Sequence, residues 1–241
     1  MMANDNFPKS VLAIGAHPDD LEWLCAGTLA KFARLGVKVS MAVATDGSAG
    51  HQVIPPKELA EIRHDEARKS ASVIGADFYW LGFSDEMVFE NIETRLVFAE
   101  LIRKAKPDLI ITHTPVDYHP DHRVVSRLVF DASFTSGLKN IQTETPYHPG
   151  VQPLAYLDTI TGANFIPTDF VDISETWAIK VQMLSNFQTQ IRWLRDHDHV
   201  DFFDMIETQA KARGYQCGVA YAEAFSFENV WPRSRPYRLL P

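Results

Sequence analysis

The stretch VLAIGAHPDDLEWLCAGTLAKFARLG, residues 11–36, decides the fold of this chain. Residues 11–14 form a short apolar run that is typical of a buried strand. After a polar turn, apolar residues recur at steps of three and four, which predicts a helix that ends near Gly36. A strand followed directly by a helix is the repeating unit of parallel sheets, so the stretch favours an α/β fold.

The alternation of strands and helices continues to residue 134 and becomes less regular beyond it. Further strands are predicted at residues 37–45, 78–81 and 109–112, and helices at residues 57–74, 92–106 and 122–134. In the second half we expect strands at residues 156–160 and 170–173, helices at residues 175–194 and 200–213, and then an irregular C-terminus. Residues 1–241 are therefore predicted to form a single Rossmann-like domain, with a doubly wound, mostly parallel sheet flanked by helices. The irregular C-terminal part is expected to wall one side of the active site.

The composition is that of an ordinary globular protein. Of the 241 residues, 46% are hydrophobic and 22% are charged, which is enough apolar material for a sizeable core. The formal net charge of −8 argues against nucleic acid as a partner, because binding to phosphate backbones requires a basic face. A local basic pocket for one small anion stays open.

Neither the start of the chain nor its later apolar runs indicate export or a membrane. The segment MMANDNFPKS lacks the regions of a signal peptide, and no apolar run reaches transmembrane length. We therefore expect a cytoplasmic protein without membrane insertion. Cys25 and Cys217 lie far apart and outside any CxxC pattern, so we interpret both as reduced, core-filling residues.

Two clusters of histidine and aspartate follow predicted strands. Residues 17–20 (HPDD) come directly after the first strand, and residues 119–122 (HPDH) come shortly after the fourth. In a doubly wound sheet these two strands tend to be neighbours at the topological switch point, where ligands bind outside the carboxyl ends of the strands. We therefore expect the two clusters to meet in space.

The two clusters together suit a catalytic zinc ion, which takes three nitrogen or oxygen ligands and keeps one position open for water. His17 and Asp20 are three residues apart across one turn and can face the same ion, and His122 would complete the set. A carboxylate and an imidazole beside an activated water are what acid–base hydrolysis requires. Three residues remain near the ion for that role: Asp19, His119 and Asp121.

Other interpretations of these segments stay open. Asp19 or Asp20 alone could cap the following helix, and the two later histidines alone could lie on a surface loop. A nucleotide site is disfavoured, because the first turn lacks G-x-G-x-x-G and its two aspartates would repel a pyrophosphate. No G-x-S-x-G elbow or Walker loop is present either.

Both segments resemble the signatures of the PIG-L/LmbE-like zinc deacetylases. AHPDDLE matches the AHPDDxE motif of that family, and DYHPDHR matches its HPDH motif. The resemblance extends through EIRHDEARKSASVIGA, WLGFSDE, PDLIITHTP, DISETWAIKVQML and AEAF, which is most of the chain. It implies a homo-oligomer, a trimer or hexamer, by analogy with family members.

The resemblance also implies roles for single residues. It gives the zinc ligands as His17, Asp20 and His122, the general base as Asp19, and the group that stabilises the oxyanion and protonates the amine as His119, with Asp121 orienting that imidazole. The implied activity is removal of an N-acetyl group from a glucosamine-type sugar or its conjugate. The chain departs from the family at Phe187, where members often carry a histidine, which puts the substrate contacts on that side in doubt.

Weaker candidates lie near the expected site. Arg63 is a substrate-binding candidate, with a solvated position on a charged helix as the alternative. Asp46 follows the second strand and could face the substrate or form the turn before Gly47. The loop at residues 47–56, with His51, could form a rim over the site.

Two other groups of residues have structural interpretations. Residues 196–199 (DHDH) resemble a metal site by composition, but a solvated loop that caps the next helix is the more ordinary reading. The tryptophans are expected in the core or an interface rather than as sugar platforms: Trp80, Trp177, Trp193 and Trp231.

Three functions are compatible with these features. The leading one is a zinc hydrolase of a linear amide, in which metal-activated water attacks an N-acetyl group. The second is a zinc hydratase of a small unsaturated acid, and the third a non-catalytic sugar-binding module. The presence of Asp19 and His119 favours hydrolysis, since binding alone requires neither residue.

Overall fold

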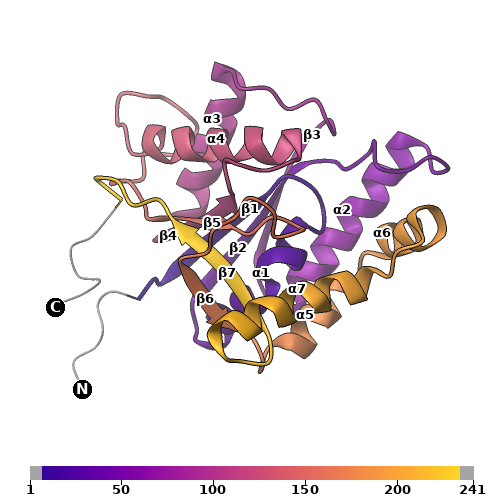
Figure 1. The fold of residues 1–241 in the computed structure, drawn as a ribbon. Coiled ribbons are helices and arrows are strands. Elements are labelled where there is room, and N and C mark those ends of the chain that lie inside the picture. Colours follow the sequence, from indigo (N-terminus) through magenta and orange to yellow (C-terminus); the bar gives the residue numbers. More distant parts are fainter. Residues whose placement is uncertain (1–6, 234–241) are drawn as a thin grey trace.

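The computed structural model describes residues 7–233 and contains one seven-stranded sheet between two layers of helices (Figure 1). The strand order is β3-β2-β1-β4-β5-β7-β6, in which β1 to β5 are parallel and β7 runs antiparallel to both of its neighbours. The strands are β1 (Ser10–Gly15), β2 (Lys38–Thr45), β3 (Asp77–Phe83), β4 (Leu109–His113), β5 (Leu154–Leu157), β6 (Asp169–Asp172) and β7 (Ala222–Phe227). The predicted α/β fold with a mostly parallel sheet is confirmed.

A separate core fills the space on each face of the sheet. The helices are α1 (Asp20–Arg34), α2 (Pro56–Val73), α3 (Ile92–Ala105), α4 (Pro120–Thr135), α5 (Trp177–Leu184), α6 (Gln188–Trp193) and α7 (Phe202–Cys217), with one π-helical turn, η1 (Leu194–Asp198). On one face α3 and α4 pack together over β1 and β4, and on the other α1 packs with α5 and α7. The continuous apolar runs of β1 and β4 are buried on both faces, as expected for central parallel strands.

The centre of the sheet is a topological switch point. β1 pairs with β2 on one side and with β4 on the other, and Ile14 lies opposite both Ala42 and Thr112. The chain therefore leaves β1 and β4 at the same edge, in adjacent positions. The expectation that the segments after these strands meet is confirmed.

The second half of the chain differs from the prediction at several boundaries. β5 starts two residues before the predicted strand at residues 156–160 and ends at Leu157. The C-terminal part, which we expected to be irregular, contains β7 inserted between β5 and β6, so that expectation is wrong. β7 is mostly buried and pairs with strands about 50 to 70 residues earlier, and such long-range pairing leaves no short-range pattern in the sequence.

The predicted helix at residues 175–194 is broken in two. α5 ends at Leu184, and Phe187 is fully buried at the break, where it packs with Val43 and Ala67. The Glu66 carboxylate accepts hydrogen bonds from the backbone N–H of Thr189 (2.9 Å) and from its hydroxyl (2.6 Å). This carboxylate from α2 thus accepts from a backbone N–H in the first turn of α6, where the helix restarts.

Three expectations about single residues need correction. Cys25 is buried as expected, but Cys217 is exposed at the end of α7. Trp231 is 85% exposed, which excludes the core and leaves the interface alternative as a prediction. Residues 196–199 are exposed, but the cap of α7 is Asp201, whose carboxylate accepts from the N–H groups of Phe203 and Asp204.

Candidate active site

The turn between β1 and α1 holds the first motif in a constrained conformation. Asp19 occupies the cap position of α1 with φ 101°, in the left-handed region, and its side chain makes no capping hydrogen bond. Asp20 Oδ2 accepts the backbone N–H of His17 at 2.6 Å, which closes the turn. The helix-cap interpretation is thus wrong for Asp19, and left-handed backbone at a residue other than glycine costs about 1 kcal/mol or more.

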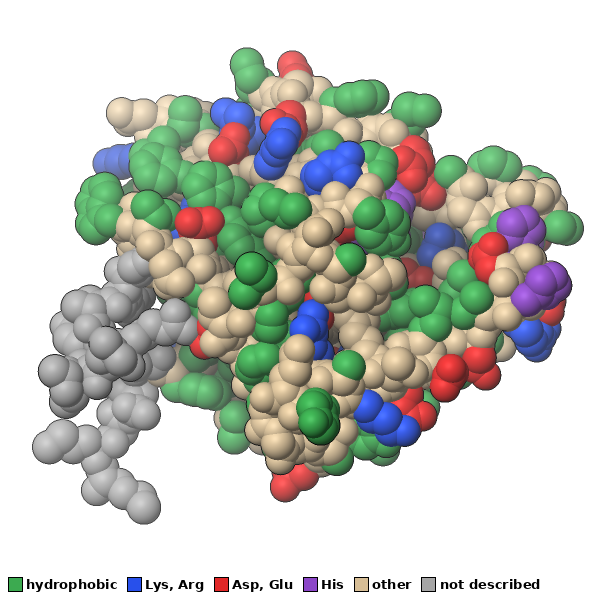
Figure 2. All heavy atoms as spheres, viewed as in Figure 1, with side chains coloured by type: hydrophobic (Ala, Val, Ile, Leu, Met, Phe, Trp, Pro, Cys, Tyr) green, Lys and Arg blue, Asp and Glu red, His purple; other side chains and the backbone are tan. Residues whose placement is uncertain are grey.

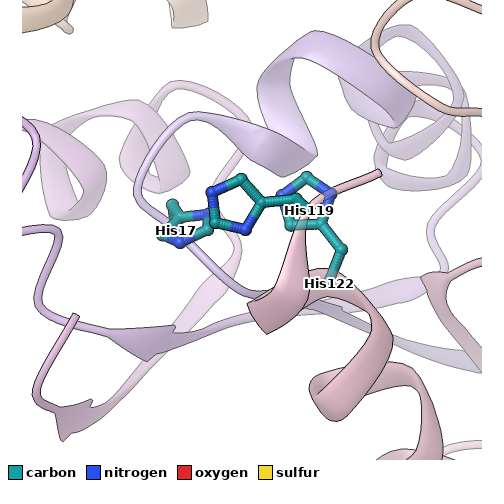
Figure 3. Close-up of side chains that lie close together, drawn as sticks. All are labelled: His17, His119 and His122. Carbon is teal, nitrogen blue, oxygen red and sulfur yellow. The ribbon is translucent and has the colours of Figure 1, made fainter. Parts of the chain in front are cut away.

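The three expected metal ligands contact one another through Asp20. His17 Nδ1 lies 3.4 Å from Asp20 Oδ2, and His122 Nε2 lies 3.3 Å from Asp20 Oδ1. Figure 3 shows the rings of His17, His119 and His122 gathered together, although they come from opposite sides of the switch point. The edge of a tetrahedron of zinc ligands is also about 3.3 Å for bonds of 2.0–2.1 Å, so each of these two histidine–aspartate separations is compatible with a shared metal ion.

Several sets of donor atoms converge here. Within the described residues, three sets have donors within 4.8 Å of one another: His17–His119–His122, Asp20–His113–His122 and His17–Asp85–Asp121. The expected set His17–Asp20–His122 is not one of the three: Asp20 and His122 share one set, and His17 and His122 share another. Asp20 also uses a different oxygen toward each histidine. In space-filling form this face carries a hollow between the surface of α6 and the main body, with charged and histidine side chains in it (Figure 2).

Carboxylates also contact the second ring nitrogen of His122 and of His17. His122 Nδ1 lies 3.0 Å from Asp117 Oδ2, and His17 Nε2 lies 3.3 Å from Asp85 Oδ1 and 3.4 Å from Asp121 Oδ2. A carboxylate behind a ligating imidazole fixes its tautomer and leaves the other nitrogen free for a metal. Our sequence reasoning missed Asp117 and Asp85, although both lie in the segments DYHPDHR and WLGFSDE.

His113 is a further residue that the sequence reasoning missed. It is the last residue of β4 and is fully buried, and its Nε2 lies 3.1 Å from Asp20 Oδ2 and accepts the Ala16 N–H at 2.9 Å. Its ring stacks on that of His122 at 3.9 Å between centroids. The strand-end rule that drew attention to the two motifs would also have pointed to this position.

Arg63 lies beneath the first motif rather than at the pocket mouth. It is 5% exposed, and its guanidinium donates to Pro18 O (2.9 Å), Gly47 O (3.1 Å) and Asp19 Oδ2 (3.4 Å). The alternative of a solvated helix residue is therefore wrong. Its contacts are with the protein, so the geometry favours support of Asp19 over contact with a substrate.

Asp46 and the following loop form a turn beside the site. Asp46 Oδ1 accepts the backbone N–H groups of Ser48 (3.0 Å) and Asp85 (3.1 Å), which agrees with the turn interpretation. The His51 ring lies 4.9 Å from the Trp193 ring, so the loop at residues 47–56 meets α6 at its outer edge.

His119 lies at the exposed side of the cluster. Its side chain is 22% exposed, and its Nε2 is 3.3 Å from Glu86 Oε1. Asp121, which we expected beside His119, instead contacts His17 and accepts the Glu86 N–H at 2.9 Å. Helix geometry explains the difference, because Asp121 is already in the first turn of α4 while His119 precedes it.

The electrostatic environment separates the titrating groups. Burial raises the pKa of Asp19 to about 7, although the Arg63 charge opposes this. Burial lowers the pKa of His119 to about 4, with repulsion from His17 and His122 adding to it. Burial also opposes charge on His122, but Asp20 and the bond to Asp117 outweigh it and raise this pKa to about 9. Asp19 is therefore poised to exchange a proton near neutral pH, and His119 is neutral there.

The protein is an α/β protein with a doubly wound sheet and with imidazoles and carboxylates at the switch point. This arrangement suits metal-assisted hydrolysis. The chain belongs to the PIG-L family: the family model, described as GlcNAc-PI de-N-acetylase, matches residues 12–133, just over half of the chain. This range contains both histidine motifs, and the resemblance noted in the sequence is confirmed.

Relatives and solved structures agree with this assignment. The uncharacterized deacetylase YaiS of Escherichia coli (strain K12) is 27% identical over 184 residues, 73% of this chain and 89% of YaiS. The structure of N,N'-diacetylchitobiose deacetylase from Pyrococcus horikoshii is 27% identical with a TM-score of 0.80, covering 91% of this chain and 84% of that one. The 4-carboxy-2-hydroxymuconate hydratase GalB from Pseudomonas putida KT2440 has a TM-score of 0.81 at 20% identity, covering 94% and 98%, a likeness of fold alone. None of the helices within residues 7–233 is both long and apolar enough to cross a membrane.

Proposed function

We propose that the protein is a zinc-dependent N-deacetylase that removes an acetyl group from the amine of an amino sugar or its conjugate. The proposal rests on one observation: two adjacent buried carboxylates have different contacts. Asp20 faces both histidines of the metal cluster, whereas Asp19 faces away from the helix and toward Arg63. A binding module needs only the first of these, and hydrolysis needs both.

His17, Asp20 and His122 would hold the zinc ion. Zinc, when bound, polarises the amide carbonyl and makes water acidic enough to react near pH 7. The carboxylates of Asp117, Asp85 and Asp121 keep the ligand imidazoles in the orientation that this requires.

Asp19 and His119 would carry the proton transfers and the charge. Asp19, with a pKa of about 7, takes a proton from the attacking water. His119 lies at the open side and donates a hydrogen bond to the oxyanion as the carbonyl becomes tetrahedral. Because the pKa of His119 is about 4, proton delivery to the leaving amine falls mainly to Asp19, which holds the proton after the attack. His119 thus keeps the role of stabilising the oxyanion, whereas the resemblance also implied that it protonates the amine.

The relatives support an N-acetylated sugar as substrate. YaiS is called a deacetylase, and the similar Pyrococcus horikoshii enzyme acts on N,N'-diacetylchitobiose, a substrate of N-acetylglucosamine units. GalB, named a hydratase, shares the fold, so hydration of an unsaturated acid is the alternative to be tested. A cytoplasmic location and a homo-oligomer stay predictions.

The test is a substrate panel with the purified, zinc-loaded protein. N-acetylated amino sugars and their conjugates are assayed for acetate and free amine, and unsaturated dicarboxylic acids for hydration. We expect equal amounts of acetate and amine from at least one sugar, loss of activity after chelation, and recovery with zinc. Hydration of an acid without acetate release from any sugar would contradict the proposal and favour the hydratase.

A further inference from the structure

The charges around the site are strongly one-sided. The carboxylates of the cluster are those of Asp19, Asp20, Asp85, Glu86, Asp117 and Asp121, joined to one another through the site histidines, Arg63 and backbone N–H groups. Across residues 7–233, the only Lys or Arg side chain with an ion pair to this cluster is Arg63. Even with a divalent metal bound, the site is left negative.

The two neighbouring arginines both contact the protein backbone. Arg63 is 5% exposed and donates to Pro18 O, Gly47 O and Asp19. Arg123, at the start of α4, donates through Nη1 to the carbonyl oxygens of Asp117 (2.7 Å) and Tyr118 (2.8 Å). Burial therefore shields Arg63 from a ligand, and Nη1 of Arg123 serves the loop before α4.

The exposed side chains beside His119 include a carboxylate and an aromatic ring. Glu86 is 45% exposed, and its carboxylate lies 3.3 Å from His119. Tyr118 and Met87, next in sequence to His119 and Glu86, are each 62% exposed. A substrate that approaches His119 thus meets a carboxylate and an aromatic ring.

We propose that the substrate is an N-acetylated sugar that carries no carboxylate or phosphate next to the acetamido group, and that Glu86 at the mouth rejects anionic conjugates. This inference rests on the proposed deacetylase function and narrows its substrate class. A sugar ring offers hydroxyls for the carboxylates and an apolar face for Tyr118, whereas an anionic aglycone beside His119 would be repelled by the Glu86 carboxylate. The local basic pocket that the sequence left open is not formed by these residues.

The experiment compares three glycosides of N-acetylglucosamine: the methyl glycoside, the glycoside of L-malate with two free carboxylates, and the dimethyl ester of the malate glycoside. We expect kcat/KM for the free malate glycoside to be about tenfold or more below that of its ester, because like charges a few ångströms apart repel. The ratio should shrink as salt is raised from about 0.01 to 1 M, since salt screens exposed charges. The ester controls for the size of the aglycone.

A variant of Glu86 tests whether this residue causes the preference for the ester over the free acid. Glu86→Gln should narrow the ratio between ester and free acid by about threefold or more, while Glu93→Gln, the same change at an exposed position of α3, should not. The ratio is the readout because Glu86 also contacts His119, so the absolute rates will change. An unchanged ratio in Glu86→Gln would overturn the role of Glu86.

The possible failures are distinguishable. A wild-type preference for the free malate glycoside would overturn the inference while leaving the deacetylase intact. Release of acetate from none of the three glycosides or the wider sugar panel would contradict the proposed function itself.

Discussion

The buried floor and the exposed mouth of the site are built in opposite ways. The floor is the part formed by His17, Asp20, Asp117 and His122, and the mouth is the part that carries Glu86 and Tyr118. On the floor, the side chains of Asp20, Asp117 and His122 are at most 3% exposed and that of His17 is 12% exposed, and each contacts one or more of the others or a further carboxylate. At the mouth, Tyr118 is 62% exposed and Glu86 45%. Buried polar atoms without a hydrogen-bond partner occur in both regions of the described chain, since they include His119 Nδ1 and also His113 Nδ1 and Asp85 Oδ1.

The difference reflects what each region must do. Metal ligands have to be aligned before the ion arrives, and buried carboxylates behind the rings provide that alignment. Groups that meet a substrate have to keep hydrogen-bonding capacity free for it. Changes on the floor should therefore alter metal affinity or turnover, and changes at the mouth should alter KM and selectivity.

The largest expected effect comes from Asp19→Asn. Asparagine tolerates the left-handed backbone at this position, so the turn should be kept. Loss of the general base should lower kcat by about 10²–10⁴-fold while zinc is retained. Steady-state kinetics and metal analysis of the same preparation measure both quantities.

Asp20→Asn is the matched control for that variant. Asp20 is the next residue in the chain and faces His17 and His122. The Asp20→Asn variant should therefore bind zinc more weakly, and this loss of affinity should be larger than any change in the kcat of the zinc-loaded variant. If the two phenotypes are exchanged, the turn presents Asp19 to the ion. The pH dependence adds a second check: activity should rise with pH through a midpoint at or below about 7, as Asp19 loses its proton, because a bound cation can only lower this pKa.

The second prediction concerns Asp117, which supports a ligand without being one. In Asp117→Asn the amide can donate to His122 Nδ1, which leaves the proton on Nε2, the nitrogen that faces Asp20. Zinc affinity should fall about 10- to 100-fold in competition with a chelator. The exposed Asp204→Asn in α7 should bind zinc as the wild type does. An unchanged affinity in Asp117→Asn would show that the imidazole is oriented by its packing alone.

The sequence pointed to the three proposed ligands more clearly than to the carboxylates that contact them. His17, Asp20 and His122 were expected to lie together because the strand-end rule specifies where polar residues of a doubly wound sheet meet. Asp117 and Asp85 were missed because a supporting carboxylate carries no spacing rule of its own. Asp85 reaches His17 from the end of β3, on the far side of β2, a contact that depends on the register of three strands.

In the fold, too, the features set by local sequence were predicted and those set by long-range contacts were not. The units from β1 to α4 were predicted within a few residues, because each is formed by one apolar run and one helical repeat. β7 and the break at Phe187 were not predicted. The first depends on pairing with β5 and β6, and the second on Glu66 of another helix.

The third prediction separates support from substrate binding at Arg63. Lysine at this position keeps the charge but cannot bridge Pro18, Gly47 and Asp19 at once. Arg63→Lys should lower kcat about tenfold through displacement of Asp19, with little change in KM. Arg68→Lys, on the exposed side of the same helix, is the control. A higher KM with unchanged kcat would restore Arg63 as a substrate-binding residue.

The smallest effect on activity is expected from Glu22, the last residue of the AHPDDxE motif. It is 2% exposed, and burial raises its pKa to about 8, although the Ser70 hydroxyl donates to it at 2.6 Å. Between pH 4.5, the ordinary pKa of this group, and about pH 8, Glu22 is protonated in the folded protein but ionised in the unfolded chain. Stability contributed by this group is thus fully present below pH 4.5 and declines as the pH rises to 8, at up to about 1.36 kcal/mol per pH unit.

Glu22→Gln removes this pH dependence and keeps an oxygen that accepts the Ser70 hydroxyl. The melting temperature of the variant relative to wild type should therefore increase from pH 5 to pH 8, with chelator present in both samples so that metal binding does not contribute. Glu61→Gln, an exposed position on α2, should show no such trend. A constant difference across this range would mean that Glu22 is already ionised in the fold, and that the floor of the site carries one more negative charge beneath Asp19 and Asp20 than its burial suggests.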